Sequence, residues 1–201
     1  MRRARRPSKQ LLWFWLDELM QESAGYERGL DIACGDMETR PSFQTKSYLG
    51  TDADAARLAA AKERTGEDGI VCRIQDMPRE IKGDFVLCLQ TIGFNKDFHV
   101  QDSLFCVEKC AAATSPRGML LINIGHEARE HFKEIEGLLK TKFNKVDSRH
   151  YGRGRNLRQE SASYLAACCM WLFPLLARSN SAPCRLLICR HRLETETHPK
   201  H

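Results

Sequence analysis

The segment RGLDIACGD, residues 28–36, decides the fold of this chain. It joins a short apolar run to a turn of small residues, Ala33, Cys34 and Gly35, where the backbone can approach a ligand closely. Further apolar runs follow it, namely SYLGTD (47–52), GIVCRI (69–74), GDFVLCLQTI (83–92) and GMLLINIG (118–125). Runs of this kind are typical of strands in a parallel sheet that is covered on both faces.

Helical segments alternate with these runs. The sequence predicts helices over Ala53–Arg64, Asp102–Ala113 and Glu127–Lys142, a sixth strand over Phe143–Tyr151 and a last strand over CRLLICRHR (184–192). This alternation indicates a doubly wound α/β fold.

The excess of positive charge is concentrated at the N-terminus. The 201 residues include 31 lysines and arginines and 26 acids, and five of the bases stand in residues 2–9, so the remainder carries 26 of each sign. A neutral body does not predict a specific nucleic-acid partner. We expect a basic tail and N-terminal helix over residues 1–27, a single domain over 28–192 with an apolar helix (161–178) inserted before the last strand, and a disordered tail over 193–201.

Nine cysteines are present, but none forms a Cys-x-x-Cys pair. An odd number of scattered cysteines favours a reduced cytoplasmic protein over a disulfide scaffold or a zinc site, so we expect no metal site. The apolar run after the first arginines, Leu11–Leu16, is shorter than the core of a secretory signal.

The chemistry of the chain is expected at the carboxyl ends of the strands, where open parallel sheets bind their ligands. Asp52 ends the second run 17 residues after Gly35, a spacing that suits a carboxylate accepting both hydroxyls of a ribose. Asp76 is expected to end the third strand. The sequence lacks the G-x-G-x-x-G, Walker A, zinc-protease and G-x-S-x-G motifs.

Five segments together resemble the class I S-adenosylmethionine-dependent methyltransferases: LDIACGD (30–36), YLGTD (48–52), RIQDMP (73–78), GDFVLCLQTI (83–92) and RGMLLINIG (117–125). They occur in the family's order and spacing and cover residues 28–125. Ala33 and Met37 replace the first and third glycines of the family's usual Gly-x-Gly-x-Gly. The fold expected with this resemblance is a mostly parallel seven-stranded sheet with helices on both faces and an antiparallel last strand.

The resemblance implies S-adenosylmethionine as cofactor. Its methionine part would lie among Asp31, Ala33 and Gly35, with Cys34 between them, and its ribose at Asp52, with Ala53 beside it. Asp76 would meet the adenine amino group, with Met77 next to the ring. Gln90 and Thr91 would lie near the sulfonium.

Three side chains near the ends of strands five and six are candidate bases: His126, His150 and Tyr151. A histidine at such a position is more often a surface or hydrogen-bonding residue, and that alternative stays open. His99 is a weaker candidate.

The function expected is methyl transfer to a small-molecule, sugar or lipid-linked acceptor. The alternative is a cofactor-binding, membrane-peripheral accessory protein without catalysis. The stretch 162–177 is too short to span a bilayer and fits a core helix, but Trp171 and Phe173 after several arginines also suit an anionic membrane surface. The expected location is therefore cytoplasmic, with the inner face of a membrane as a further hypothesis.

Overall fold

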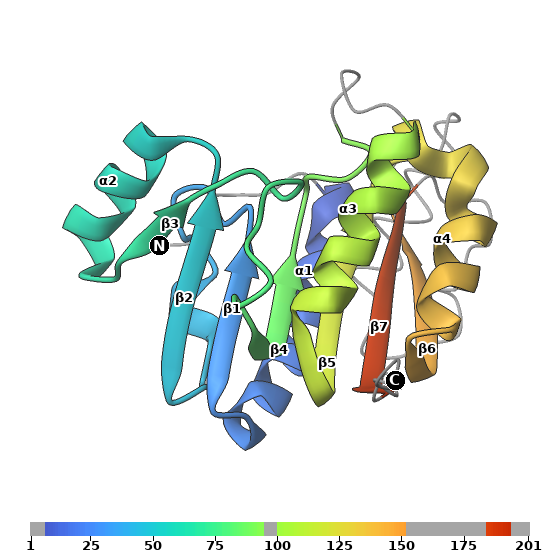
Figure 1. Ribbon diagram of the computed structural model, residues 1–201, viewed down its shortest axis with the longest axis horizontal. Helices are drawn as coiled ribbons and strands as arrows, with labels where there is room; N and C mark the ends of the chain where they lie inside the picture. The colour runs from blue at the N-terminus through green and yellow to red at the C-terminus, as the bar shows by residue number, and fades with distance from the viewer. Residues whose placement is uncertain (1–6, 95–99, 152–183, 194–201) are drawn as a thin grey trace, which may run out of the picture.

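Seven strands form one sheet in the computed structural model, which describes residues 7–94, 100–151 and 184–193. The strand order is β3-β2-β1-β4-β5-β7-β6 (Figure 1). Strands β1 to β5 run parallel, and β7 lies between β5 and β6, antiparallel to both. The strands are β1 (Arg28–Ile32), β2 (Ser47–Asp52), β3 (Gly69–Val71), β4 (Gly83–Cys88), β5 (Thr114–Ile124), β6 (Phe143–Tyr151) and β7 (Cys184–Arg192). The predicted fold class is confirmed.

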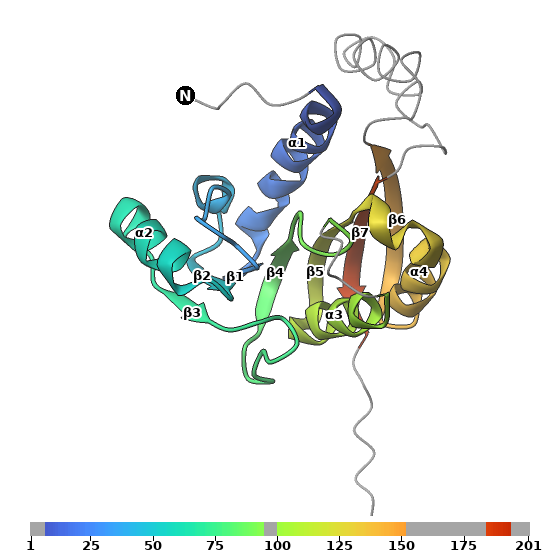
Figure 2. The same cartoon turned by 90° about the horizontal axis from the view of Figure 1, so that it is seen from above.

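Helices cover both faces of this sheet (Figure 2). Helices α3 (Val100–Ala113) and α4 (Phe132–Lys140) lie on one face, and α1 (Pro7–Leu19) and α2 (Ala55–Thr65) lie on the other. Three short 3-10 helices complete the described elements: η1 (Met20–Gly25), η2 (Arg40–Ser42) and η3 (His126–His131).

The apolar strands are explained by burial on both sides. In β4, Phe85 and Leu87 belong to the core under α1, whereas Val86 and Cys88 belong to the core under α3 and α4. Successive residues of a strand point to opposite faces, so a central strand must be apolar throughout. All four side chains are buried.

Strand β3 is shorter than predicted. It ends at Val71, which pairs with Asp52, the last residue of β2, and β3 is the edge strand of the sheet. No neighbouring strand remains for residues 72–74, so the chain turns there. The third strand therefore does not reach Asp76.

The helix predicted over Glu127–Lys142 is divided. The 3-10 helix η3 precedes α4, and Ala128 between its turns has non-helical φ and ψ of −94° and 16°. By contrast, both ends of α2 are capped by neighbouring residues. The Asp54 side chain accepts hydrogen bonds from the amides of Ala56 and Arg57 at the start of the helix, and Gly66, with φ +76°, ends it.

Several expectations fall outside the described residues: the basic tail (1–6), His99, the apolar helix (161–178) and the terminal tail (194–201). Within the described ranges, none of the helices is long and apolar enough to cross a bilayer. The seven cysteines among them are free thiols.

Candidate functional site

A cavity of about 580 Å³ opens at the carboxyl ends of β1, β2 and β4. Its walls come from the loop after β1, the start of α2, the turn after β3, the loop after β4 and one residue of α1, Trp13. This is the edge at which the sequence predicts a ligand.

Eight of the ten predicted cofactor residues line this cavity: Asp31, Ala33, Cys34, Gly35, Asp52, Ala53, Gln90 and Thr91. They come from the carboxyl ends of β1 and β2 and from the loops after β1, β2 and β4, which the sheet brings together. Their role in binding is a prediction, but their convergence is a feature of the structure.

Asp76 and Met77 are not among the lining residues. The Asp76 side chain is 67% exposed with Arg73 Nε 3.9 Å away, and Met77 is buried in the core beside α3. Because β3 ends early, the preceding turn forms this wall instead, through Cys72, Arg73, Ile74 and Gln75. Sequence reasoning missed these four residues, since it extended the strand through them.

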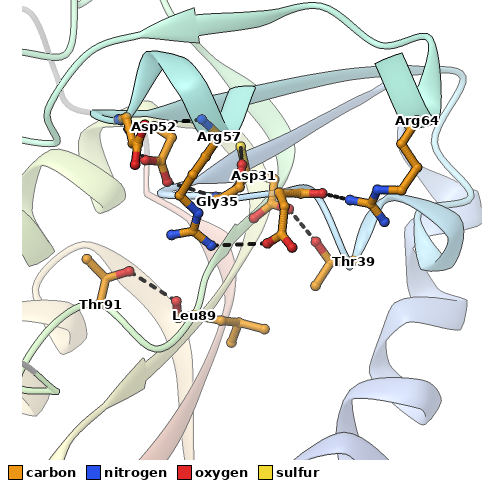
Figure 3. Close-up of polar contacts among 11 residues, drawn as sticks. Asp31, Gly35, Thr39, Asp52, Arg57, Arg64, Leu89 and Thr91 are labelled. Carbon is orange, nitrogen blue, oxygen red and sulfur yellow. Dashed lines mark hydrogen bonds and ion pairs between the residues drawn. The ribbon is translucent and has the colours of Figure 1, made fainter. Parts of the chain in front are cut away.

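Asp52 is held rigidly at the end of β2. Its Oδ2 accepts a hydrogen bond from the Gly35 amide at 2.7 Å, and its Oδ1 accepts one from the Asp54 amide at 2.9 Å (Figure 3). An ionised carboxylate has about four acceptor sites, so two remain for a ligand. The side chain thereby ties the loop after β1 to the start of α2.

The loop after β1 requires small residues. Gly35 has φ +57°, and a Cβ added to it would meet the Arg57 guanidinium at 2.2 Å. Arg57 Nη2 in turn lies 3.0 Å from Asp36 Oδ1. Ala33 and Met37, which stand at glycine positions of the related motif, also have positive φ, 55° and 53°. Three residues of this loop therefore have left-handed backbone, and only Gly35 among them is a glycine.

Asp31 is almost fully buried at the inner end of the cavity. Its Oδ2 accepts hydrogen bonds from the hydroxyls of Thr39 and Tyr48. Burial raises the pKa of Asp31 to about 7, although the two hydroxyls lower it in part. Burial likewise raises the pKa of the Cys34 thiol, which makes it a poor nucleophile.

The loop after β4 carries an unusual backbone. Gln90 has φ +55°, a conformation that costs a residue other than glycine about 1–3 kcal/mol and persists only where the surrounding structure enforces it. Its amide donates to Asn123 Oδ1 at 2.6 Å, and the Thr91 hydroxyl donates to the Leu89 carbonyl at 3.0 Å (Figure 3).

The three candidate bases stand at the predicted edge but do not line the cavity. His126 is 57% exposed, with its Nε2 3.1 Å from Glu127 Oε1. His150 is half-buried within β6. Tyr151 is buried, its hydroxyl accepts a hydrogen bond from Asn123 Nδ2, and burial raises its pKa. A buried phenol with a raised pKa holds its proton, and the role of Tyr151 as a base stays a prediction.

The part of the chain that the structure describes holds no group of three histidine, cysteine or acidic side chains that could bind a metal ion.

No protein-family model matches the sequence, and no curated protein does. Solved structures do match. The N-methyltransferase NodS from Bradyrhizobium japonicum WM9, in complex with S-adenosyl-L-homocysteine, aligns with a TM-score of 0.64 at 13% identity over 96% of this chain and 90% of that chain. The plantazolicin methyltransferase BamL aligns with a TM-score of 0.59 at 15% identity over 92% of this chain and 85% of its own.

The chain spans about half the length of two sugar methyltransferases that it also matches. One is the amino pentose methyltransferase CalS10 from Micromonospora echinaspora, with 20% identity, a TM-score of 0.48 and coverage of 59% of this chain and 51% of that one. The other, KedS8 from Streptoalloteichus, is covered over 49%. From the strand order, the ligand edge and the NodS and BamL alignments, the chain has the fold of the class I S-adenosylmethionine-dependent methyltransferases.

Proposed function

We propose that this chain binds S-adenosylmethionine in the cavity and transfers its methyl group to a small-molecule acceptor. The observation that carries the proposal is the Asp52 carboxylate, which lines the cavity at the end of β2 and is fixed by the Gly35 amide at 2.7 Å. Ligands of this size occupy pockets of about 300–1,000 Å³, and the cavity is within that range.

The cavity residues fit the three parts of the cofactor. The two acceptor sites left on Asp52 suit the two ribose hydroxyls. Asp31 suits an ammonium group, and the turn at Cys72–Gln75 offers the wall for adenine that Asp76 and Met77 do not form. When bound, the cofactor would supply a methyl group on a cationic sulfur.

The contribution of the chain is mainly positional. Methyl transfer is an in-line displacement, which depends above all on how donor and acceptor are aligned. Gln90 and Thr91 line the cavity from the loop after β4, and Trp13 lines it from α1. A small acceptor fits this arrangement. We include sugars and lipid-linked compounds among the proposed acceptors. Of the similar structures, NodS is an N-methyltransferase and BamL is a plantazolicin methyltransferase.

We expect S-adenosylmethionine and S-adenosylhomocysteine to bind in the micromolar range, on the order of −7 to −9 kcal/mol. Isothermal calorimetry on folded protein measures this directly. ATP is the matched control, because it shares adenosine but would bring phosphates toward the carboxylates of Asp31, Asp36 and Glu38. The absence of saturation with both sulfur compounds would refute the proposal.

Catalysis is tested separately from binding. Fractions of small molecules from a cell extract, incubated with the protein and isotopically labelled cofactor, should yield a labelled product that mass spectrometry identifies. The Asp52→Ala variant is the control. Saturable binding without any labelled product would favour the non-catalytic alternative.

A membrane-peripheral location is a further proposal, based on residues 162–177 and the arginines before them. Arg149, the one of these arginines that the structure describes, is engaged elsewhere: its Nη1 lies 3.3 Å from Glu18 Oε2 and its guanidinium 5.6 Å from the Trp15 ring. We expect the protein to float with anionic vesicles at low salt and to dissociate as salt rises. A chain beginning at Lys9 is the control for the N-terminal arginines, and its failure to float would assign residues 162–177 to the core.

A further inference from the structure

We infer that Tyr151 is a positioning residue, which fixes the cavity loop after β4 by way of the buried Asn123 amide. The link to methyl transfer rests on the proposed function, whereas the link between Tyr151 and the loop is a property of the fold itself.

The Asn123 side chain connects two elements that lie on either side of β5. Its Oδ1 accepts the Gln90 amide hydrogen at 2.6 Å, and its Nδ2 donates to the Tyr151 hydroxyl at 2.5 Å. Asn123 is fully buried, so water does not compete for these bonds. The Gln90 amide can only donate, so it requires the acceptor Oδ1, and the Asn123 Nδ2 is left to donate to the Tyr151 hydroxyl oxygen. The bond to Tyr151 therefore holds the Asn123 side chain in the position where Oδ1 meets Gln90.

The loop after β4 begins where the backbone pairing between β4 and β5 ends, so its conformation must be held by other contacts. Strands β4 and β5 pair as far as Cys88 and Ile122, and Asn123 is the next residue of β5. Two residues beyond Cys88, Gln90 adopts φ +55°, which persists only when neighbouring groups enforce it. The Asn123 side chain binds the amide of this residue and so fixes the peptide unit that carries the strain.

Among the described residues, the Asn123 side chain links Tyr151 to the cavity loop. It is the last residue of β6, buried in the core under α1, and it is not among the cavity residues. Leu89, Gln90 and Thr91 do line the cavity, at a different loop from Asp52 and Gly35. Loss of the Tyr151 hydroxyl should therefore alter the wall formed by the β4 loop and leave the Asp52 wall intact.

The first readout needs no ligand. In the parent protein, the Gln90 amide should be protected from hydrogen exchange, as measured by NMR. In Tyr151→Phe and in Asn123→Leu its exchange should accelerate about tenfold or more, because the acceptor is misplaced or absent. Tyr26→Phe is the matched control: Tyr26 packs against the same core, does not line the cavity and loses the same hydroxyl.

The second readout is the affinity for S-adenosylhomocysteine, measured by calorimetry on the same proteins. We expect Tyr151→Phe and Asn123→Leu each to bind about three- to tenfold more weakly, and Tyr26→Phe to bind like the parent. Since Tyr151 acts through Asn123, the double variant should bind no more weakly than Asn123→Leu alone. A residue that only stabilised the core would change melting without this non-additivity.

The outcomes are distinct. Unchanged Gln90 exchange in folded Tyr151→Phe, or additive losses of affinity in the double variant, would overturn the inference. If the parent protein fails to bind S-adenosylhomocysteine, the proposed function fails, but the exchange rates still decide whether Tyr151 positions the loop. If Tyr151→Phe does not fold, Tyr151→Leu, which also lacks the hydroxyl and keeps Asn123, supplies the same exchange test.

Discussion

Asp52→Ala should weaken the binding of S-adenosylhomocysteine by about 3–6 kcal/mol, more than a hundredfold. The estimate assigns roughly 1.5–3 kcal/mol to each of two charged hydrogen bonds to ribose hydroxyls. The structure adds a second effect that the sequence does not reveal. The carboxylate accepts the amides of Gly35 and Asp54, so its removal leaves both without an acceptor, and the ligand-free protein should also melt at a lower temperature.

Asp54→Ala is the matched control for this experiment. Asp54 is two residues away and also uses its carboxylate to accept two amide hydrogens, those of Ala56 and Arg57 at the start of α2. It is not a cavity residue, so its loss should cost about 1 kcal/mol of stability with ligand affinity preserved. Calorimetry and thermal melting on both variants separate the two effects. Equal affinities for parent and Asp52→Ala would show that the ribose lies elsewhere.

The sheet and its ligand edge could be predicted because their signals are local. Each strand from β1 to β5 is an apolar run, and a parallel order places their carboxyl ends at one edge. The turn of Ala33, Cys34 and Gly35 and the acid Asp52 lie directly at such ends, and all four line the cavity.

The positions that sequence reasoning missed depend on pairing between distant segments. The length of β3 is set by β2, since Val71 pairs with the last residue of that strand, and no pattern within residues 69–76 shows this. The role of Tyr151 depends on Asn123, 28 residues earlier. A tyrosine at a strand end has the same local sequence whether it faces a cavity or a buried amide.

Asp31→Asn should stabilise the ligand-free protein at neutral and alkaline pH. Burial raises the pKa of Asp31 from 3.8 to about 7, so between these values the native state binds more protons than the unfolded chain. The free energy of unfolding must then fall as the pH rises across this window, by about 1.4 kcal/mol per unit and about 4 kcal/mol in all. An asparagine is neutral throughout, and its carbonyl oxygen can keep the hydrogen bonds from Thr39 and Tyr48.

Denaturation in urea at several pH values measures the difference between Asp31→Asn and the parent. The difference should be small near pH 4 and should grow to as much as about 4 kcal/mol in favour of the variant at pH 8. Asp84→Asn provides a control of opposite sign. Burial raises the pKa of Asp84, but hydrogen bonds from Arg28 and Ser115 and the charge of Arg28 outweigh this and lower it, so this carboxylate stabilises the fold at neutral pH and loses that effect on acidification. A pH-independent difference for Asp31→Asn would refute the buried ionisation.

The same variant connects stability with function. In the proposed function, the ammonium group of the ligand lies beside Asp31 and favours its ionised carboxylate. The affinity of the parent for S-adenosylhomocysteine should therefore increase as the pH rises toward 7, by up to about tenfold per pH unit. Asp31→Asn should lose this pH dependence and bind more weakly at pH 8, where it is the more stable protein. A residue kept for packing alone would show the gain in stability without the loss of affinity. The opposite signs of the two effects would identify Asp31 as an acid retained for its ligand at the expense of the fold.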